Sequence, residues 1–501
     1  MTMEHTARVP RRHFIAVIGA AAAGTVLAAC GQPAPAPTAA PAAKPTEAPK
    51  AAAEPTKPAA QPTAAPAAAK PTEAPKTTAE PTKPAAQPTA APAAAGAKKV
   101  ITFWQEANTP TAQQGWDAHV AAFNKAKPEI EIKRVFQSEM NNIIKVALAS
   151  DTGPDCFQRD IPPSYHQPLV DAKLVIAMDD YYKSLPNLAK VFPWAKKRAT
   201  IAGKVWGVPH EVEFIPIYYN KAVLEKAGIK EIPTKSYDDF LGVCKALKDK
   251  GIQALALAGR ARTQPGHIFS VLAMTTIGKE GFEDILYGEG KWDQAGIVDA
   301  ATNLKNLLDM GYLPKDVMAQ DGPVVQAAFA AGRYAMWPTG TWSLMGFEDS
   351  RKENKDFNYD YFIPGVANSK LQYPQIAGGI GGGFSIAARA KDKDSCALWI
   401  DYLMSPDAQK IWTEVFFQIA PTPFDASTVK LPDIPKKAME LMSKGPEMGY
   451  NISVVIPSNV VEIYWNGLGG ILSGQLTPKD WASKVQAEWE IAKKEGRVLK
   501  P

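Results

Sequence analysis

Apolar and polar residues follow two different periods in the part of the chain that begins at residue 98. Residues 98–104 form a β-branched and aromatic run, and residues 130–136 alternate between apolar and charged side chains, so both are predicted to be strands. Between them, residues 117–127 carry apolar side chains at helical spacing and end before Pro128, which predicts a helix. The order strand, helix, strand indicates the start of a doubly wound α/β unit.

The same two periods recur to the end of the chain. Ser236 is predicted to cap a helix over residues 237–250, with its apolar face at Phe240, Cys244 and Leu247. Further strands are predicted at 212–219, 253–258, 333–337 and 359–364, and further helices at 140–150, 220–228, 296–310, 324–331, 394–403 and 406–417. The chain from residue 98 onward is too long for one ordinary core, so two lobes are predicted.

The first residues have the features of an export signal. Arg11 and Arg12 precede a 16-residue apolar run over 14–29, which ends in Leu-Ala-Ala before Cys30. As a helix this run would reach about 24 Å, which is short of the roughly 30 Å hydrocarbon core of a membrane. The end of the run resembles the lipobox of bacterial lipoproteins, so Cys30 is predicted to be lipidated after removal of 1–29. The arginine pair partly matches the twin-arginine signal, which leaves the export route open between two pathways.

A tract of Ala, Pro, Thr, Lys, Glu and Gln follows the predicted anchor. Residues 31–97 contain no aromatic residue and no Ile, Leu, Val or Met, and the segment at 44–50 is repeated at 70–76. Such a composition cannot bury enough apolar surface to offset the entropy of ordering. Residues 30–97 are therefore predicted to be a lipidated cysteine followed by a disordered tether.

Charge and cysteine content narrow the function classes. The net charge is +5, with Lys and Glu interleaved and without a basic block, so nucleic-acid binding is not predicted. Cys156, Cys244 and Cys396 remain after Cys30 is assigned to the lipid, and their spacing does not fit a metal site. We expect three buried thiols, no metal and no cofactor.

Several segments together resemble family 1 of the bacterial extracellular solute-binding proteins, the receptors of ABC importers for sugars that include the maltose-binding proteins. The segments that carry the resemblance are ITFW at 101–104, GPD at 153–155, GKVWGVP at 203–209, YNK at 219–221, SYDDF at 236–240, FAAGRYAM at 329–336 and GTW at 340–342. Each is weak alone, but they occur in the family's order over most of the chain from 98 to 480.

The resemblance implies a two-lobe periplasmic-binding-protein fold, α/β and type II-like, that closes on its solute like a hinge. The chain would cross between lobes near 209–213, 361–366 and 417–422. Lobe 1 would comprise 98–210 and 365–418, and lobe 2 would comprise 211–364 and 419–501. The expected protein is a monomer that delivers a sugar or oligosaccharide to an ABC permease at the outer face of the cell membrane.

Candidate ligand contacts in lobe 1 follow the first predicted strand and lie in a predicted loop at 158–160. Ligands of open α/β sheets bind beyond the carboxyl ends of the strands, which directs attention to Glu106 and Asn108. Asp160, after residues 153–155, occupies another position that would face the site. Glu106 and Asn108 could equally belong to a solvated loop.

Two glutamates lie on the first predicted crossing. Glu211 and Glu213 point to one face of an extended segment, and Glu213 matches an acidic ligand-contacting position in maltose-binding relatives. Ionised carboxylates accept charge-assisted hydrogen bonds from sugar hydroxyls, and they could equally accept an ammonium group.

Aromatic residues supply the remaining candidates. Trp342 occupies the family's Gly-x-Trp position and is predicted to stack on a sugar ring, whereas Trp337 is more typical of a core residue. Trp465 is a candidate for a second platform. Gly379 is included as a contact, within a glycine-rich run at 378–383 that we interpret as close-packed backbone at a crossing.

Two other functions remain open on the sequence. The acidic candidates would also suit a receptor for a polyamine or another cationic solute, while Arg260, Arg262 and His267 either favour an acidic solute or belong to solvated loops.

A secreted glycoside hydrolase could use Glu211 and Glu213 as acid and base. Both glutamates would lie on one strand face, whereas hydrolysis needs carboxylates on either side of the bond, so a binding protein without catalytic residues is predicted.

Overall fold

The computed structural model describes residues 98–106, 109–443 and 448–498. The predicted signal, Cys30, the tether and Asn108 lie outside these residues. Within them, no helix combines the length and the apolar character needed to cross a membrane.

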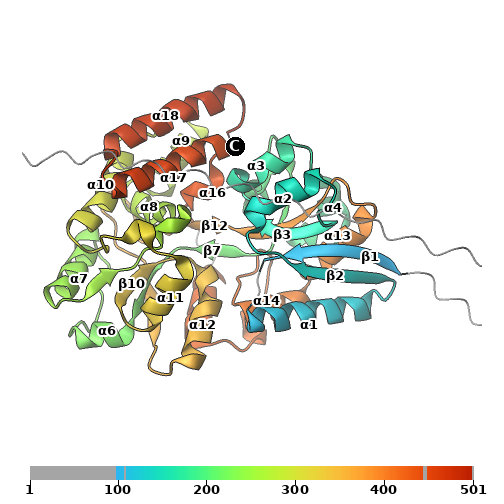
Figure 1. Ribbon diagram of the computed structural model, residues 1–501, viewed down its shortest axis with the longest axis horizontal. Helices are drawn as coiled ribbons and strands as arrows, with labels where there is room; N and C mark the ends of the chain where they lie inside the picture. The colour runs from blue at the N-terminus through green and yellow to red at the C-terminus, as the bar shows by residue number, and fades with distance from the viewer. Residues whose placement is uncertain (1–97, 107–108, 444–447, 499–501) are drawn as a thin grey trace, which may run out of the picture. The chain divides into compact units, whose positions relative to one another are not determined.

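A five-stranded sheet forms the centre of the first lobe, at the right in Figure 1, with strand order β2-β1-β3-β13-β6. Its strands are β1 (Lys99–Gln105), β2 (Ile130–Phe136), β3 (Cys156–Asp160), β6 (Val208–Pro209) and β13 (Gly382–Ile386). β2 and β3 run parallel to β1 on either side, and β13 is antiparallel to β3. The predicted strand, helix, strand opening is confirmed.

Helices cover both faces of this sheet, and the core between them is rich in tryptophan. The helices and short strands are α1 (Pro110–Ala126), α2 (Met140–Ala149), α3 (Pro163–Asp171), α4 (Asp179–Ser184), η1 (Leu188–Lys190), α5 (Pro193–Arg198), β4 (Thr200–Ile201), β5 (Lys204–Val205), α13 (Lys393–Leu403) and α14 (Pro406–Phe416). Phe103 of β1 packs against Trp116 of α1 and Trp399 of α13, at ring-centroid distances of 5.2 and 5.7 Å.

The helix predicted from residue 117 begins earlier, at Pro110. Thr109 caps it, because the Thr109 hydroxyl accepts a hydrogen bond from the Ala112 amide at 3.1 Å, and proline suits the first turn. The first buried positions are small residues, Ala112 and Gly115, so the hydrophobic pattern gave little sign of this first part of the helix.

A second sheet, in the order β11-β8-β10-β9, forms the other lobe, at the left in Figure 1. Its strands are β8 (Ile217–Asn220), β9 (Gln253–Leu255), β10 (Tyr334–Pro338) and β11 (Tyr359–Phe362). The surrounding helices are α6 (Lys221–Lys226), α7 (Tyr237–Asp249), η2 (Gly259–Ala261), α8 (Thr263–Thr276), α9 (Gly278–Tyr287), α10 (Ala295–Asp309), η3 (Val317–Ala319), α11 (Gly322–Ala330), η4 (Thr341–Ser343), α12 (Leu344–Glu353), η5 (Ala426–Thr428), α15 (Asp433–Ser443), α16 (Ile452–Val455), α17 (Ser458–Leu472) and α18 (Pro478–Lys494).

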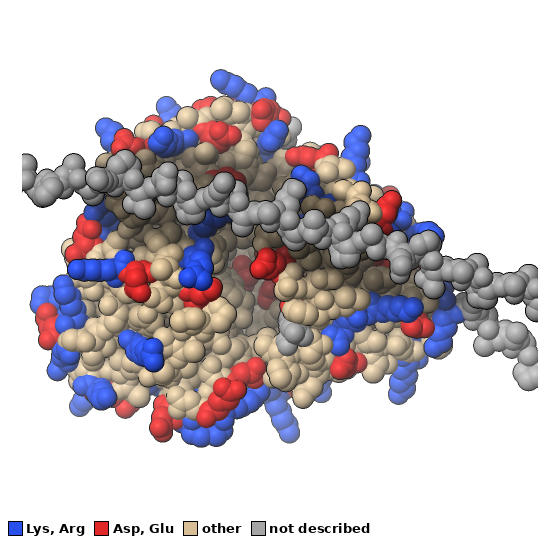
Figure 2. Space-filling model, in the orientation of Figure 1, with Lys and Arg blue, Asp and Glu red and all other residues tan. Residues whose placement is uncertain are grey.

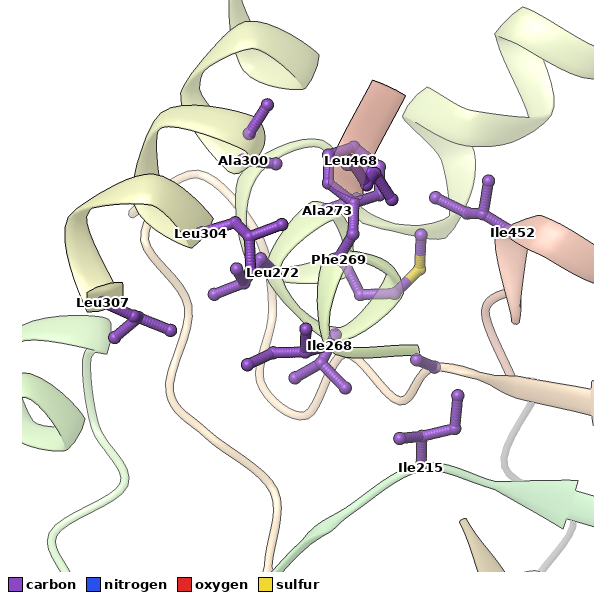
Figure 3. Packing of buried hydrophobic residues seen from close by; sticks show 14 of the residues in the cluster. Ile215, Ile268, Phe269, Leu272, Ala273, Ala300, Leu304, Leu307, Ile452 and Leu468 are labelled. Carbon is purple, nitrogen blue, oxygen red and sulfur yellow. The ribbon is translucent and has the colours of Figure 1, made fainter. Parts of the chain in front are cut away.

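Helix α8 is the centre of the largest hydrophobic cluster. All of its residues from Pro265 to Thr276 are buried, as expected of a helix that is enclosed on all sides. In Figure 3, Phe269 and Leu272 of α8 lie among Leu304 of α10, Leu468 of α17 and Ile452 of α16. Helices α10, α16 and α17 therefore pack around α8 in the second lobe.

A two-stranded ribbon connects the lobes (Figure 1). β7 (Val212–Phe214) pairs antiparallel with β12 (Gly378–Ile380), and the Val212 amide donates to the Ile419 carbonyl at 2.8 Å. Three passages of chain thus run side by side between the two sheets, and the two-lobe α/β fold predicted from the sequence is confirmed.

The segment after residue 365 stays with the second lobe for longer than the predicted boundary. The Tyr237 amide at the start of α7 donates to the Val366 carbonyl at 3.1 Å, and the Ala367 amide donates to the Thr275 carbonyl of α8 at 2.9 Å. After β12 in the ribbon, the chain joins the first sheet through β13. Cys156, Cys244 and Cys396 are free, buried thiols, as predicted.

Candidate ligand-binding cleft

Acidic side chains from separate segments meet between the two lobes. Glu106 follows β1 and Asp160 ends β3, so the parallel course of these strands brings both residues to the same edge of the sheet. Figure 2 shows Asp and Glu side chains in the hollow between the lobes. The structure thus brings together two residues that lie 54 positions apart in the sequence.

Glu211 and Glu213 lie beside this edge, at the hinge ribbon. Glu211 is 7% exposed and Glu213 is 5% exposed. The register places Gly379 opposite Glu213, and a Cβ atom on Gly381 would collide with the Glu213 carboxylate. Glycine at 381 therefore provides the space that the Glu213 carboxylate occupies. Both glutamates are buried and do not lie on a solvated strand edge.

The four carboxylates affect one another's ionisation. Burial and, to a smaller extent, the charge of Asp160 raise the pKa of Glu106 to about 8, and Arg159 opposes the shift. Burial likewise raises the pKa of Glu211 to about 8, with Asp160 adding to the effect. The pKa of Glu213 is raised by burial first and then by the charges of Glu211 and Asp160. We call this group of Glu106, Asp160, Glu211 and Glu213 the acidic cluster; burial raises the pKa of each member, and Glu106 and Glu211 hold protons at neutral pH.

No lysine or arginine forms an ion pair with the acidic cluster within the described ranges. Arg159 is nearby, but its guanidinium donates to the Asn141 side chain and to the Tyr165 carbonyl, both at 3.0 Å. Asn141 in turn donates to Asp160 at 2.9 Å. His210 lies 3.9 Å from Glu211, and burial lowers the pKa of His210 to about 3, so this imidazole is neutral at pH 7.

Trp342 packs against the main hydrophobic cluster of the second lobe. It lies in η4, is partly buried, and its ring centroid is 4.9 Å from that of His267. A Cβ on Gly340 would collide with the indole, so this glycine is needed for the position of Trp342. Trp337 is 3% exposed and packs against Phe329 and Phe347, which confirms that it is a core residue.

Trp465 of α17 contacts the first lobe. Its ring centroid lies 5.8 Å from that of Tyr165 in α3, and its indole nitrogen is buried without a hydrogen-bond partner. The charges of Asp160 and Glu213 both act on Tyr165, so Tyr165 links the aromatic contact to the acidic cluster. Sequence reasoning missed Tyr165, because a tyrosine in a short helix after two prolines carries no recognisable motif.

The other candidates lie elsewhere. Gly379 is in the ribbon, where a Cβ would stand 2.8 Å from the Arg198 guanidinium. Arg260 and Arg262 are exposed and pair with Asp321 at 3.3 Å and Glu462 at 2.9 Å, as expected for loop residues. No set of three or more His, Cys, Asp or Glu side chains is arranged to hold a metal ion in the part of the chain that the structure describes.

Comparison with known proteins identifies the class. A family model described as bacterial extracellular solute-binding protein matches residues 118–439, and the chain belongs to this family. The family designation implies a location outside the cytoplasm, and the predicted family resemblance is confirmed.

Individual relatives are distant. An uncharacterized ABC transporter extracellular-binding protein of Pyrococcus horikoshii is 23% identical over 382 residues, which cover 74% of this chain and 81% of that protein. The maltotriose-binding protein of Pyrococcus abyssi is 22% identical, and the match spans 50% of this chain and 51% of that protein.

Solved structures show the same fold. A chitin oligosaccharide binding protein aligns with a TM-score of 0.68 and 22% identity, covering 79% of this chain and 99% of the other. A solute binding protein of Thermotoga lettingae with bound tagatose aligns with a TM-score of 0.66 and 18% identity, with 79% and 99% covered. The proteins in both solved structures, like the family by its description, are binding proteins.

Proposed function

We propose that this protein is the receptor of an ABC importer that captures a sugar or oligosaccharide and delivers it to the permease. The observation that supports the proposal is the group of buried carboxylates where the two lobes meet, and we place Trp342 and Trp465 in the same cleft as stacking surfaces. Carboxyl groups form hydrogen bonds with hydroxyls, and indole faces pack on the apolar faces of sugar rings. Relatives whose names or titles mention sugars support the same class.

A thermal-shift screen over monosaccharides and oligosaccharides tests the proposal. A ligand at a hundred times its dissociation constant raises the free energy of unfolding by about 2.7 kcal/mol, so a true ligand gives a clear shift. Incubation of the same sugars with the protein should release no new reducing ends. If no sugar shifts the melting temperature, the proposal is wrong.

The acidic cluster gives one specific reason to test a cationic solute, such as a polyamine, in the same screen. Salt distinguishes the two classes, because the affinity for a neutral sugar changes little with ionic strength whereas that for a dication falls. Neutral sugars that bind equally at low and high salt would exclude the cationic alternative.

We further propose that lipid on Cys30 anchors the receptor to the outer face of the cell membrane and that it acts as a monomer. One acyl chain gives only marginal membrane binding, so stable anchoring requires at least two. Cys30→Ala should release the protein into the soluble fraction with its ligand affinity unchanged. Wild-type protein that is already soluble, with no lipid mass on its N-terminal peptide, would contradict the anchor.

A further inference from the structure

A cavity of about 680 Å³ lies behind the hinge ribbon, apart from the ligand-binding cleft. Val212 lines this cavity, whereas its neighbour Glu213 belongs to the acidic cluster. Successive residues of a strand point to opposite faces, so the cavity and the cleft lie on opposite sides of β7. Its volume is in the range of pockets that hold drug-sized molecules.

Both lobes contribute walls to this rear cavity. Phe192, Trp194 and Lys197 come from the first lobe, at the start and along α5, while Tyr287 and Tyr450 come from the second lobe. The third passage of chain between the lobes adds Ile419, Thr422 and Phe424. Any ligand in the rear cavity would therefore touch both lobes and the hinge at once.

The walls of the rear cavity consist largely of aromatic and methionine side chains, and they carry more positive than negative charge. Beside its five aromatic residues, the cavity is lined by Met439, Met442 and Met448, whose flexible side chains adapt to a ligand's shape. The carboxylate in the wall, Glu283, is already engaged by Lys279 at 3.0 Å and by the Tyr450 hydroxyl at 2.8 Å.

The two cations of the wall have no such acidic partner in the described ranges. Arg198 donates to the neutral carbonyls of Gly378, Met448 and Gly449 at 3.1 to 3.2 Å, and Glu283 acts on its charge without forming an ion pair with it. Lys197 lies over the Tyr287 ring, 4.8 Å from its centroid. An aromatic ligand with a single negative charge complements such walls, because its ring packs on the aromatic side chains and its charge faces the cations.

We propose that the rear cavity is a second binding site, specific for a small aromatic anion, whose occupation holds the two lobes in the arrangement seen here. In that arrangement the lobes also meet in front, through Tyr165 and Trp465. Rotation about the ribbon that opens the front of the molecule brings the rear walls together, so a filled rear cavity opposes opening.

Anilinonaphthalene sulfonate is a suitable probe, because it is an aromatic anion that fluoresces when it enters an apolar site. We expect saturable binding of one molecule per protein. Ala426→Trp, which fills the cavity from its wall, should raise the dissociation constant at least about tenfold. Ala121→Trp, at an exposed position on α1, is the matched control and should leave binding unchanged.

Charge and location are tested separately. Lys197→Met should weaken binding of the sulfonate about two- to fivefold and leave binding of phenylnaphthylamine, its neutral analogue, unchanged. Hydrogen exchange with the probe present should slow in α5, β7 and the segment 448–450, which together represent both lobes and the hinge. Three results would each overturn the proposal. They are binding of the sulfonate to Ala426→Trp with wild-type affinity, equal affinity of the wild type for the sulfonate and for phenylnaphthylamine, and protection from exchange that is confined to one lobe.

Discussion

At the scale of single residues, the unusual feature is the acidic cluster. Its four carboxyl groups lie close together, and within the described ranges none of them forms an ion pair with a lysine or arginine. A buried, unpaired charge costs several kcal/mol, and the raised pKa values of Glu106 and Glu211 show that protons reduce this cost. A protonated carboxyl both donates and accepts hydrogen bonds, which matches a sugar hydroxyl. The cluster therefore suits a polyhydroxylated ligand without needing a compensating cation.

Substitution of Trp342 should weaken sugar binding more than substitution of Glu213. Trp342→Ala removes the whole stacking surface, whereas in Glu213→Gln the amide keeps the shape and only one hydrogen bond is altered. We expect a loss of affinity of at most about tenfold to a hundredfold for Glu213→Gln and a larger loss for Trp342→Ala, measured by titration calorimetry. Both variants should retain the wild-type circular dichroism spectrum; unfolding of Trp342→Ala would assign the indole to the core.

Glu211→Gln should change how stability depends on pH. Burial raises the pKa of Glu211 from 4.5 to about 8, so the folded protein keeps a proton that the unfolded chain has lost between these values. The stabilisation from this proton is complete below the unfolded pKa and is lost as pH rises through the folded pKa.

We therefore expect the melting temperature of Glu211→Gln, relative to wild type, to rise as pH increases over this window. The buried histidines His119 and His166, whose pKa values burial lowers to about 3, are present in both proteins, so their effect cancels in the difference. A difference that does not vary with pH would show that Glu211 ionises normally.

At the scale of elements, the hinge ribbon positions the cleft through its glycines. The position of a Cβ on Gly381 coincides with the Glu213 carboxylate, so this residue connects β12 and β13 while leaving room for a ligand contact. Gly381→Ala should displace the carboxylate and weaken binding by about tenfold or more, with a smaller effect on the fold. Titration calorimetry and urea unfolding measure the two effects.

Gly242→Ala is the matched control for this substitution. Gly242 lies inside α7, and nothing stands within 4 Å of the Cβ that the substitution would add. Alanine in a helix is more favourable than glycine by about 0.5 to 1 kcal/mol, so this variant should be slightly more stable and bind normally. If Gly381→Ala also binds normally, Glu213 does not contact the ligand from its present position.

At the scale of the whole molecule, Arg198 fixes the lobes at the rear of the hinge. It comes from α5 of the first lobe, is 8% exposed, and its guanidinium lies 4.2 Å from the centroid of the Tyr450 ring of the second lobe. Arg198→Met fills similar space but leaves three carbonyl groups without their donor, so we expect a loss of about 2 to 4 kcal/mol in urea unfolding.

Arg198→Lys separates charge from geometry. Lysine keeps the positive charge but lacks the planar fork that reaches several carbonyls, so its stability should fall between that of wild type and Arg198→Met. If both variants are as stable as wild type, the contact between α5 and the 448–450 segment contributes nothing to the fold.

Local patterns were sufficient for most elements. Ser236 and Asp239 form the capping box that starts α7, because both partners lie within one helical turn and the sequence alone specifies their contact. The strand at 130–136 is observed at the predicted residues, since its alternation reflects one buried face. The first turns of α1 were not predicted, because small buried residues carry no hydrophobic signal.

The sequence by itself determined the two-lobe α/β fold, the family, and the separate segments from which Glu106, Asp160, Glu213 and Trp342 come, because periodicity and short motifs are local properties. Only the tertiary structure decided that the carboxylates share one cluster, that Arg159 is bound to Asn141, and that Tyr165 meets Trp465 across the lobes. Those contacts join residues that are distant in the sequence, and burial, which sets their pKa values, exists only once the lobes are packed.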